Sequence, residues 1–169
     1  MQAPGGLPNG VPLLTSLLLT PERLRSGRKI AIDVPVLRAI LCLAASTLPF
    51  DEEFYLKTYP DVADAYHSGE IADLHMHFVE VGYFEGRLPT RPQFDDIFYK
   101  EMYPDVAAAV ATGELESALD HYIKTGAAEC RFANRSDMLV WERWLQIVGA
   151  GSATEGDTPS VLAIDGRVR

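Results

Sequence analysis

One stretch of this chain occurs twice, and this duplication restricts the possible folds more than any other feature. Residues 50–88 (copy 1) align with residues 94–132 (copy 2) without a gap, at an offset of 44 positions and with 16 identities in 39 aligned positions. Internal repeats of this length are typical of small units that bury an apolar face only by stacking on a neighbour. We therefore expect the two copies to share one fold and one core.

Cap and turn residues divide each copy into three short helical segments. Aspartate and serine cap helix N-termini, proline suits the first turn of a helix, and glycine ends one. These residues follow in the same order in both copies: Asp51, Pro60, Gly69, Asp73 and Gly82, then Asp95, Pro104, Gly113, Ser117 and Gly126. The pattern predicts three helices per copy, each too short to be stable alone.

The segments on either side of the copies predict further helices. A short one begins at Thr20, and an apolar one from Asp33 to Ser46 is expected to be buried against the copies. After copy 2, a helix capped by Asn134 or Ser136 and ended by Gly149 is expected to cover the core. Its apolar face contains Met138, Trp141, Leu145 and Val148.

The two ends of the chain have the character of arms. Residues 28–32 alternate weakly and fit a strand or an extended arm, and residues 160–164 fit a short strand, so the two segments could pair within one molecule or between two. The expected fold is all-α, with two tandem three-helix repeats packed with an N-terminal and a C-terminal helix, and with extended terminal arms. The predicted segments are 1–49, 50–88, 94–132, 133–149 and 150–169.

Charge is concentrated in the copies. Copy 1 has nine acidic and two basic residues and copy 2 has eight and three, in a 169-residue chain of net charge −9. An acidic surface repels phosphate backbones, so we expect no nucleic-acid partner. No run reaches the ~18–20 apolar residues of a membrane span. The chain also lacks the basic start and cleavage site of a signal peptide, so we expect cytoplasmic synthesis and leave the final location open.

The residues that the copies share form the pattern F-D-x-x-F-Y, Y-P-D-V-A, G-E, H-[FY], G and E-x-R. This pattern resembles a short helical tandem repeat of large bacterial proteins, appended to secreted RTX-type proteins, glycosyltransferases and other surface-polysaccharide proteins. The resemblance covers residues 50–132 and implies an accessory module. Cys130 departs from it, because copy 1 and the pattern have glycine there (Gly86). No Gly-Gly-x-Gly-x-Asp nonapeptide is present, so the calcium binding of RTX proteins is not implied.

The candidate site residues are those that both copies keep. They are Tyr59, Pro60, Asp61, His77, Glu85 and Arg87, with Tyr103, Pro104, Asp105, His121, Glu129 and Arg131. One interpretation makes each histidine, with the glutamate of its copy, a ligand or metal site built twice. The other gives it a hydrogen-bonded packing role, which explains more simply why a repeat uses it twice.

The other shared charges have structural explanations. An aspartate directly after a proline complements the helix dipole, and the glutamate and arginine near the end of each copy are expected to form salt bridges between units or to lock a loop. No set of residues in the sequence specifies a catalytic, metal or cofactor site. We therefore expect no enzyme activity and no cofactor.

The expected docking positions are apolar and basic residues of the arms: Leu17, Leu18, Leu19, Arg28, Lys29, Val161, Leu162 and Ile164. Exposed apolar groups at this density mark a partner surface. The sequence favours a non-catalytic interaction module that binds proteins through its arms, as an oligomer or in a larger assembly. By resemblance it would be an adaptor in a bacterial surface or phage-like assembly linked to cell-surface polysaccharide, with a glycan as a further candidate partner. The alternative is a small enzyme, or an enzyme-associated domain, of polysaccharide synthesis, which needs a pocket with convergent ionisable groups.

Overall fold

The computed structural model describes residues 12, 14, 15, 17, 19–26 and 30–152, with the backbone alone for Pro21 and residues 148–152. The described residues form helices and turns with no strand among them, so the predicted all-α class is confirmed. Among the helices that the structure describes in full, α2 (Pro21–Arg25) and α3 (Val34–Ala45) lie before copy 1, and α10 (Arg135–Ser152) follows copy 2.

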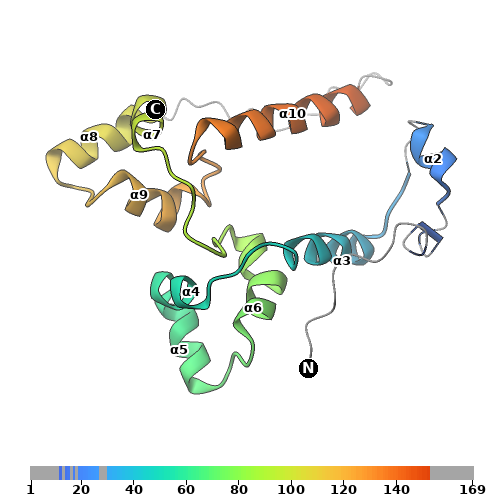
Figure 1. The fold of residues 1–169 in the computed structure, drawn as a ribbon, viewed down its shortest axis with the longest axis horizontal. Helices are drawn as coiled ribbons and strands as arrows, with labels where there is room; N and C mark the ends of the chain where they lie inside the picture. The colour runs from blue at the N-terminus through green and yellow to red at the C-terminus, as the bar shows by residue number, and fades with distance from the viewer. Residues whose placement is uncertain (1–11, 13, 16, 18, 27–29, 153–169) are drawn as a thin grey trace. The chain divides into compact units, whose positions relative to one another are not determined.

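The helices of copy 1 are α4 (Glu52–Thr58), α5 (Pro60–Ser68) and α6 (Leu74–Glu80), followed by a 3₁₀ turn, η1 (Gly82–Glu85). Figure 1 shows the three helices as one group, coloured cyan to green. The side chain of Asp51 accepts a hydrogen bond from the backbone N–H of Phe54 at 2.9 Å, which satisfies a free amide at the start of α4.

The helices of copy 2 are α7 (Asp96–Met102), α8 (Pro104–Thr112) and α9 (Ala118–His121), followed by a π-helical turn, η2 (Tyr122–Gly126). Both α7 and α8 begin and end 44 positions after α4 and α5. Gly69 and Gly113 end α5 and α8 with φ of 82° and 78°, a left-handed conformation that favours glycine.

The copies differ in how the third helix ends. The prediction that it ends at the glycine does not hold in copy 1, where α6 stops at Glu80 and Gly82 begins η1. In copy 2 the regular helix stops at His121, and the π-helical turn continues to Gly126. Lys124 and Asp120 form an ion pair at 2.8 Å beside this turn. Gly82 and Gly126 thus occupy equivalent positions relative to the first helix of their copies, although the backbone conformation that leads to the glycine differs between the copies.

Each copy has a hydrophobic core of its own, so the expectation of one shared core is wrong. The core of copy 1 is centred on Tyr55 and Phe78, and α3 contributes Ala45 to it. The core of copy 2 is centred on Tyr99 and Tyr122. A cluster of aromatic rings in each copy provides enough apolar area for a separate small core.

The apolar helix α3 is not buried as predicted. Only Ala45, at its C-terminal end, is buried, and it packs with Cys42 against the core of copy 1. Arg38 places its guanidinium 4.5 Å from the ring centroid of Phe84. At the other end of α3, Val34 is 76% exposed. A helix fixed through its last turns leaves the rest of its apolar circumference open.

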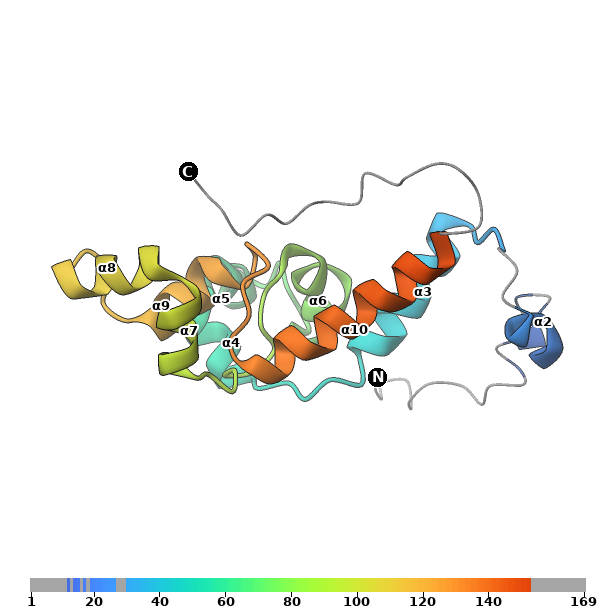
Figure 2. The same cartoon turned by 90° about the horizontal axis from the view of Figure 1, so that it is seen from above.

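The last helix, α10, belongs to a separate unit that begins at Arg135. Figure 2 shows it as one continuous helix. It runs to Ser152 and passes the predicted end at Gly149, because a glycine inside a helix costs only about 1 kcal/mol relative to alanine. From Arg135 to Ile147 every side chain is exposed except that of Met138, which is half-buried. The core-covering role expected of this helix is therefore not seen in its described side chains.

The predicted N-terminal arm is partly helical where it is described. The backbone N–H groups of Leu17 and Leu19 donate hydrogen bonds to the carbonyl of Leu14, and all three side chains are half-buried. Ile30 and Ile32 belong to no helix and are 39% and 38% exposed. The other predicted arm residues, Leu18, Arg28, Lys29, Val161, Leu162 and Ile164, lie outside the described residues.

Candidate functional site

A tyrosine and a histidine form the centre of each copy. The Tyr55 hydroxyl is hydrogen-bonded to His77 Nδ1 at 3.2 Å, and the Tyr99 hydroxyl to His121 Nδ1 at 3.1 Å. Both tyrosines are fully buried, so each hydroxyl needs a partner, and the histidine supplies it. Each shared histidine thus contacts a buried tyrosine of its own copy, and a glycine lies beside the same tyrosine.

Gly82 and Gly126 leave room for these hydroxyls. A Cβ atom added to Gly82 would collide with the Tyr55 hydroxyl oxygen, and one added to Gly126 would collide with that of Tyr99. Neither glycine has a positive φ. The duplicated glycine is therefore required for space beside the tyrosine.

An arginine near the end of copy 1 ties the last loop back to α5. Arg87 donates hydrogen bonds from Nη1 and Nη2 to both oxygens of Asp61, at 3.0 and 2.8 Å, and from Nε to Glu85 at 2.9 Å. Its guanidinium lies 5.0 Å from the ring centroid of Tyr59. The Tyr59 hydroxyl in turn accepts the backbone N–H of Leu88 at 2.6 Å.

Copy 2 repeats this arrangement with the equivalent residues. Arg131 bonds to Asp105 and Glu129 at 2.9 and 2.8 Å and lies 4.9 Å from the ring centroid of Tyr103. The Tyr103 hydroxyl accepts the backbone N–H of Phe132 at 2.8 Å. Each arginine thus joins the last loop of its copy to the first turn of that copy's second helix. Of the two explanations that the sequence allowed, the loop lock describes these pairs and a salt bridge between units does not.

Electrostatics in the clusters favour the protonation states that these contacts need. The hydrogen bonds from Arg87 hold the pKa of Asp61 below its usual value. Burial opposes ionisation of Asp105, but the hydrogen bond and charge of Arg131 outweigh it and lower that pKa too. Burial, and next the positive charge of Arg87, lower the pKa of His77, which keeps the imidazole neutral near pH 7.

Burial also raises the pKa of the central tyrosines, Tyr55 and Tyr99, so both hydroxyls keep their protons. In copy 1, the neutral Tyr55 hydroxyl and the neutral His77 imidazole share one hydrogen bond without placing a charge in the core. The clusters therefore act as closed polar networks, in which the main donors and acceptors are matched inside the copy.

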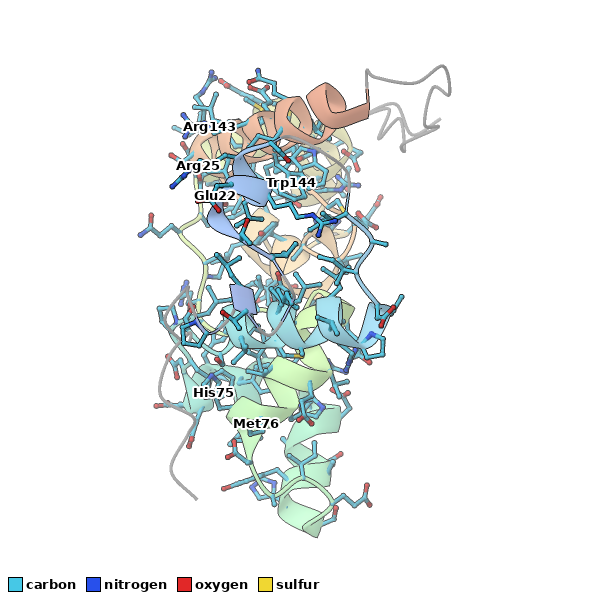
Figure 3. All side chains as sticks on the ribbon, turned by 90° about the vertical axis from the view of Figure 1, so that its right-hand side faces the viewer. Glu22, Arg25, His75, Met76, Arg143 and Trp144 are labelled. Carbon is cyan, nitrogen blue, oxygen red and sulfur yellow. The ribbon has the colours of Figure 1, made fainter. Side chains whose placement is uncertain are left out.

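His75 differs from His77 in its surroundings. Its ring stacks on Phe50, with centroids 5.1 Å apart, and its Nε2 atom is buried without a hydrogen-bond partner among the described residues. Figure 3 labels His75 on α6. The equivalent residue of copy 2 is Leu119. The position thus favours an apolar side chain, and His75 and His77 do not form a common site.

Cys130 is the one non-glycine residue with positive φ in the described chain, at 60°. It takes the place of Gly86, whose φ is 76°. A Cβ added to Gly86 would lie 3.1 Å from the Cα of Ala128, at a close contact between the two copies. Cys130 is exposed. The sequence identifies this departure but not the left-handed conformation that makes it costly.

The surface that the sequence reasoning missed is on α10. Its exposed large apolar side chains are Leu139, Val140, Trp141, Trp144, Leu145 and Ile147. The two tryptophans signal it in the sequence, since a helix with apolar residues around half its circumference needs a cover. The sequence pattern predicts that this helix covers the core of the copies, and it predicts docking positions in the arms.

Among the described residues, no three His, Cys, Asp or Glu side chains are grouped so as to hold a metal ion. No helix in the described ranges combines the length and apolar character needed to cross a membrane. Comparisons of the chain with protein-family models, with curated proteins and with solved structures find no significant match.

Proposed function

We propose that this protein is a non-catalytic interaction module, in which the two copies form a scaffold and the segments outside them bind partners. The observation that carries the proposal is the exposed apolar surface of α10, where both tryptophans are at least 36% exposed and Ile147 is 61% exposed. Large apolar side chains gathered on one helix are typical of a protein contact surface.

The shared residues of the copies support the same function. In an enzyme, some ionisable groups are directed at a concave site and left unpaired for the substrate. Here Arg87 and Arg131 bond to carboxylates of their own copies, and each central histidine bonds to a tyrosine. Duplicated groups that satisfy one another serve the scaffold.

The setting that we propose comes from the resemblance of residues 50–132. The module would be an adaptor in a bacterial surface or phage-like assembly, close to cell-surface polysaccharide. Proteins are its partners, and a glycan is a further candidate.

Affinity capture from the producing cell tests the proposal. The baits are the full chain, a chain ending at Ser152, and the W141S/W144S variant, with Ile97→Ser as the matched control because Ile97 is 73% exposed on α7. We expect defined partner proteins on the full chain and the control, and their loss from the tryptophan variant with unchanged helix content. Equal capture by all baits, or turnover of a sugar nucleotide by the purified chain, would contradict the proposal.

A further inference from the structure

The last loop of copy 1 contacts copy 2. A Cβ atom added to Gly86 would lie 3.1 Å from the Cα atom of Ala128, so the two backbones approach closely at this point. The side chain of Leu88 packs against the hydrophobic core of copy 2. Among the described residues, no hydrophobic side chain of copy 2 packs against the core of copy 1 in return. In this contact, copy 1 supplies the side chain and copy 2 supplies the core.

The loop lock of copy 1, formed by Tyr59, Asp61 and Arg87, holds this loop in place. Gly86 and Leu88 lie on either side of Arg87, whose guanidinium bonds to both oxygens of Asp61 at 3.0 and 2.8 Å. The backbone N–H of Leu88 donates a hydrogen bond to the Tyr59 hydroxyl at 2.6 Å. A bidentate pair of an arginine and a carboxylate fixes direction as well as distance. The backbone that carries Leu88 is thus held by residues of copy 1.

The equivalent loop lock of copy 2 does not hold a contact of this kind. It holds Phe132 by the same backbone bond, from its N–H group to the Tyr103 hydroxyl at 2.8 Å. Phe132 is not among the described side chains that pack against the core of copy 1. Ala133, the next residue, is buried in the core of copy 2 itself. The two locks therefore share their geometry and differ in what they hold.

We infer that the loop lock of copy 1 couples the folding of the two copies, because it holds Leu88 against the core of copy 2. The contact stabilises both copies, since a coupling free energy is reciprocal. The locks nevertheless act differently: weakening the lock of copy 1 loosens copy 2, whereas weakening the lock of copy 2 leaves copy 1 unchanged. Because the Asp61 side chain is 63% exposed, a partner that binds it can open the lock and thereby loosen copy 2. The coupling does not involve α10, so it holds or fails separately from the proposed function.

Native-state hydrogen exchange of the full chain tests the coupling, with the slowest amides of each copy as reporters. D61N should make the amides of copy 2 exchange about three to ten times faster, although Asp61 belongs to copy 1. D105N is the matched control, because the Asp105 side chain is 62% exposed and bonds to the equivalent arginine. It should speed exchange in copy 2 alone. Unchanged exchange in copy 2 of D61N, or faster exchange in copy 1 of D105N, overturns the inference.

L88A separates the coupling from a general loss of stability in copy 1. It removes the side chain that packs on copy 2 and keeps the backbone bond to Tyr59. Exchange in copy 2 should become at least about tenfold faster. Adding D61N to L88A should leave the exchange of copy 2 at the L88A rate, because the lock then holds no large side chain against that core. If L88A leaves copy 2 unchanged, or if D61N keeps its full effect on copy 2 in the double variant, the inference is wrong.

Discussion

At one position the two copies have residues of very different size, and their neighbours explain why. In copy 1 it is Phe84, whose ring lies under the guanidinium of Arg38 from α3. In copy 2 it is Ala128, at the close approach of Gly86. The residues that match between the copies contact one another inside each copy, as the tyrosine and histidine pairs do. The difference at this position therefore reports what lies outside each copy, and the matched tyrosine and histidine pairs report how a copy is held together.

The largest expected effect comes from the two glycines beside the central tyrosines. Gly82→Ala and Gly126→Ala should each destabilise the protein by about 1–3 kcal/mol, because the new methyl group collides with a buried hydroxyl. Denaturant unfolding measures this. Gly69→Ala is a matched control, since a Cβ there meets no atom within 4 Å and only the left-handed φ opposes it. If alanine leaves stability unchanged in one copy, the two copies are not equivalent at this glycine.

Replacing the shared histidine should lower stability by a similar amount in either copy. His77→Gln and His121→Gln each remove the partner of a buried tyrosine hydroxyl, which should lower stability by about 1–2 kcal/mol. Added zinc should leave the melting temperature of the wild type unchanged. A zinc-dependent rise that both substitutions abolish would instead identify the histidines as ligands, the other interpretation of the sequence.

The Tyr55–His77 pair should make the stability of the protein depend on pH. The pKa of His77 is lowered in the folded state, so the unfolded chain binds a proton more readily. The stabilisation is fully present above the unfolded-state pKa of 6.5 and is lost as pH falls below it. His77→Gln should flatten the stability curve in this range. A wild-type curve that is already flat there would contradict the assignment.

Substitutions at the left-handed position should change stability in opposite directions in the two copies. Cys130→Gly relieves a strained φ and should stabilise the protein by about 0.5–1 kcal/mol, after the added freedom of glycine in the unfolded chain is subtracted. Gly86→Ala adds the same strain and a contact with Ala128, so it should destabilise. Melting temperatures of the two variants show the sign directly. Two shifts of the same sign would mean that the loops are not equivalent.

The smallest effect is expected at His75. His75→Leu introduces the residue that copy 2 has at this position and removes a buried nitrogen without a partner, which should stabilise the protein by up to about 1 kcal/mol. His75→Gln keeps a polar group there and should give no gain. Destabilisation by leucine would show that the nitrogen has a partner that these contacts do not include.

Local chemistry made part of the fold predictable. Asp51 and Asp95 cap their helices, and Pro60 and Pro104 begin the next ones, because caps and prolines act within a few residues. The separate cores and the exposure of α3 and α10 depend on long-range packing, which an apolar pattern does not specify. The pattern of α10 shows that a face needs a cover and leaves the identity of the cover open.

The sequence predicts which residues belong to the candidate site but not which of them contact one another. The repeat singled out His77, Arg87 and their equivalents, because duplication marks what the unit needs. It could not show that His77 meets Tyr55, 22 positions away, or that Arg87 meets Asp61, 26 positions away. Such pairs depend on how the helices of a copy turn back on one another. The matched contacts in both copies favour the packing interpretation, and the zinc measurement tests it.

We propose that the residues common to both copies hold the fold, whereas the partner surface lies on α10. Affinity capture from the producing cell and denaturant unfolding, both carried out on H77Q/H121Q and W141S/W144S, test this division most directly. The histidine variant should lose about 2–4 kcal/mol of stability and still capture the partner proteins when folded. The tryptophan variant should keep the stability of the copies and capture none of them. A histidine variant that is stable but captures no partner, or a tryptophan variant that unfolds, would contradict this division.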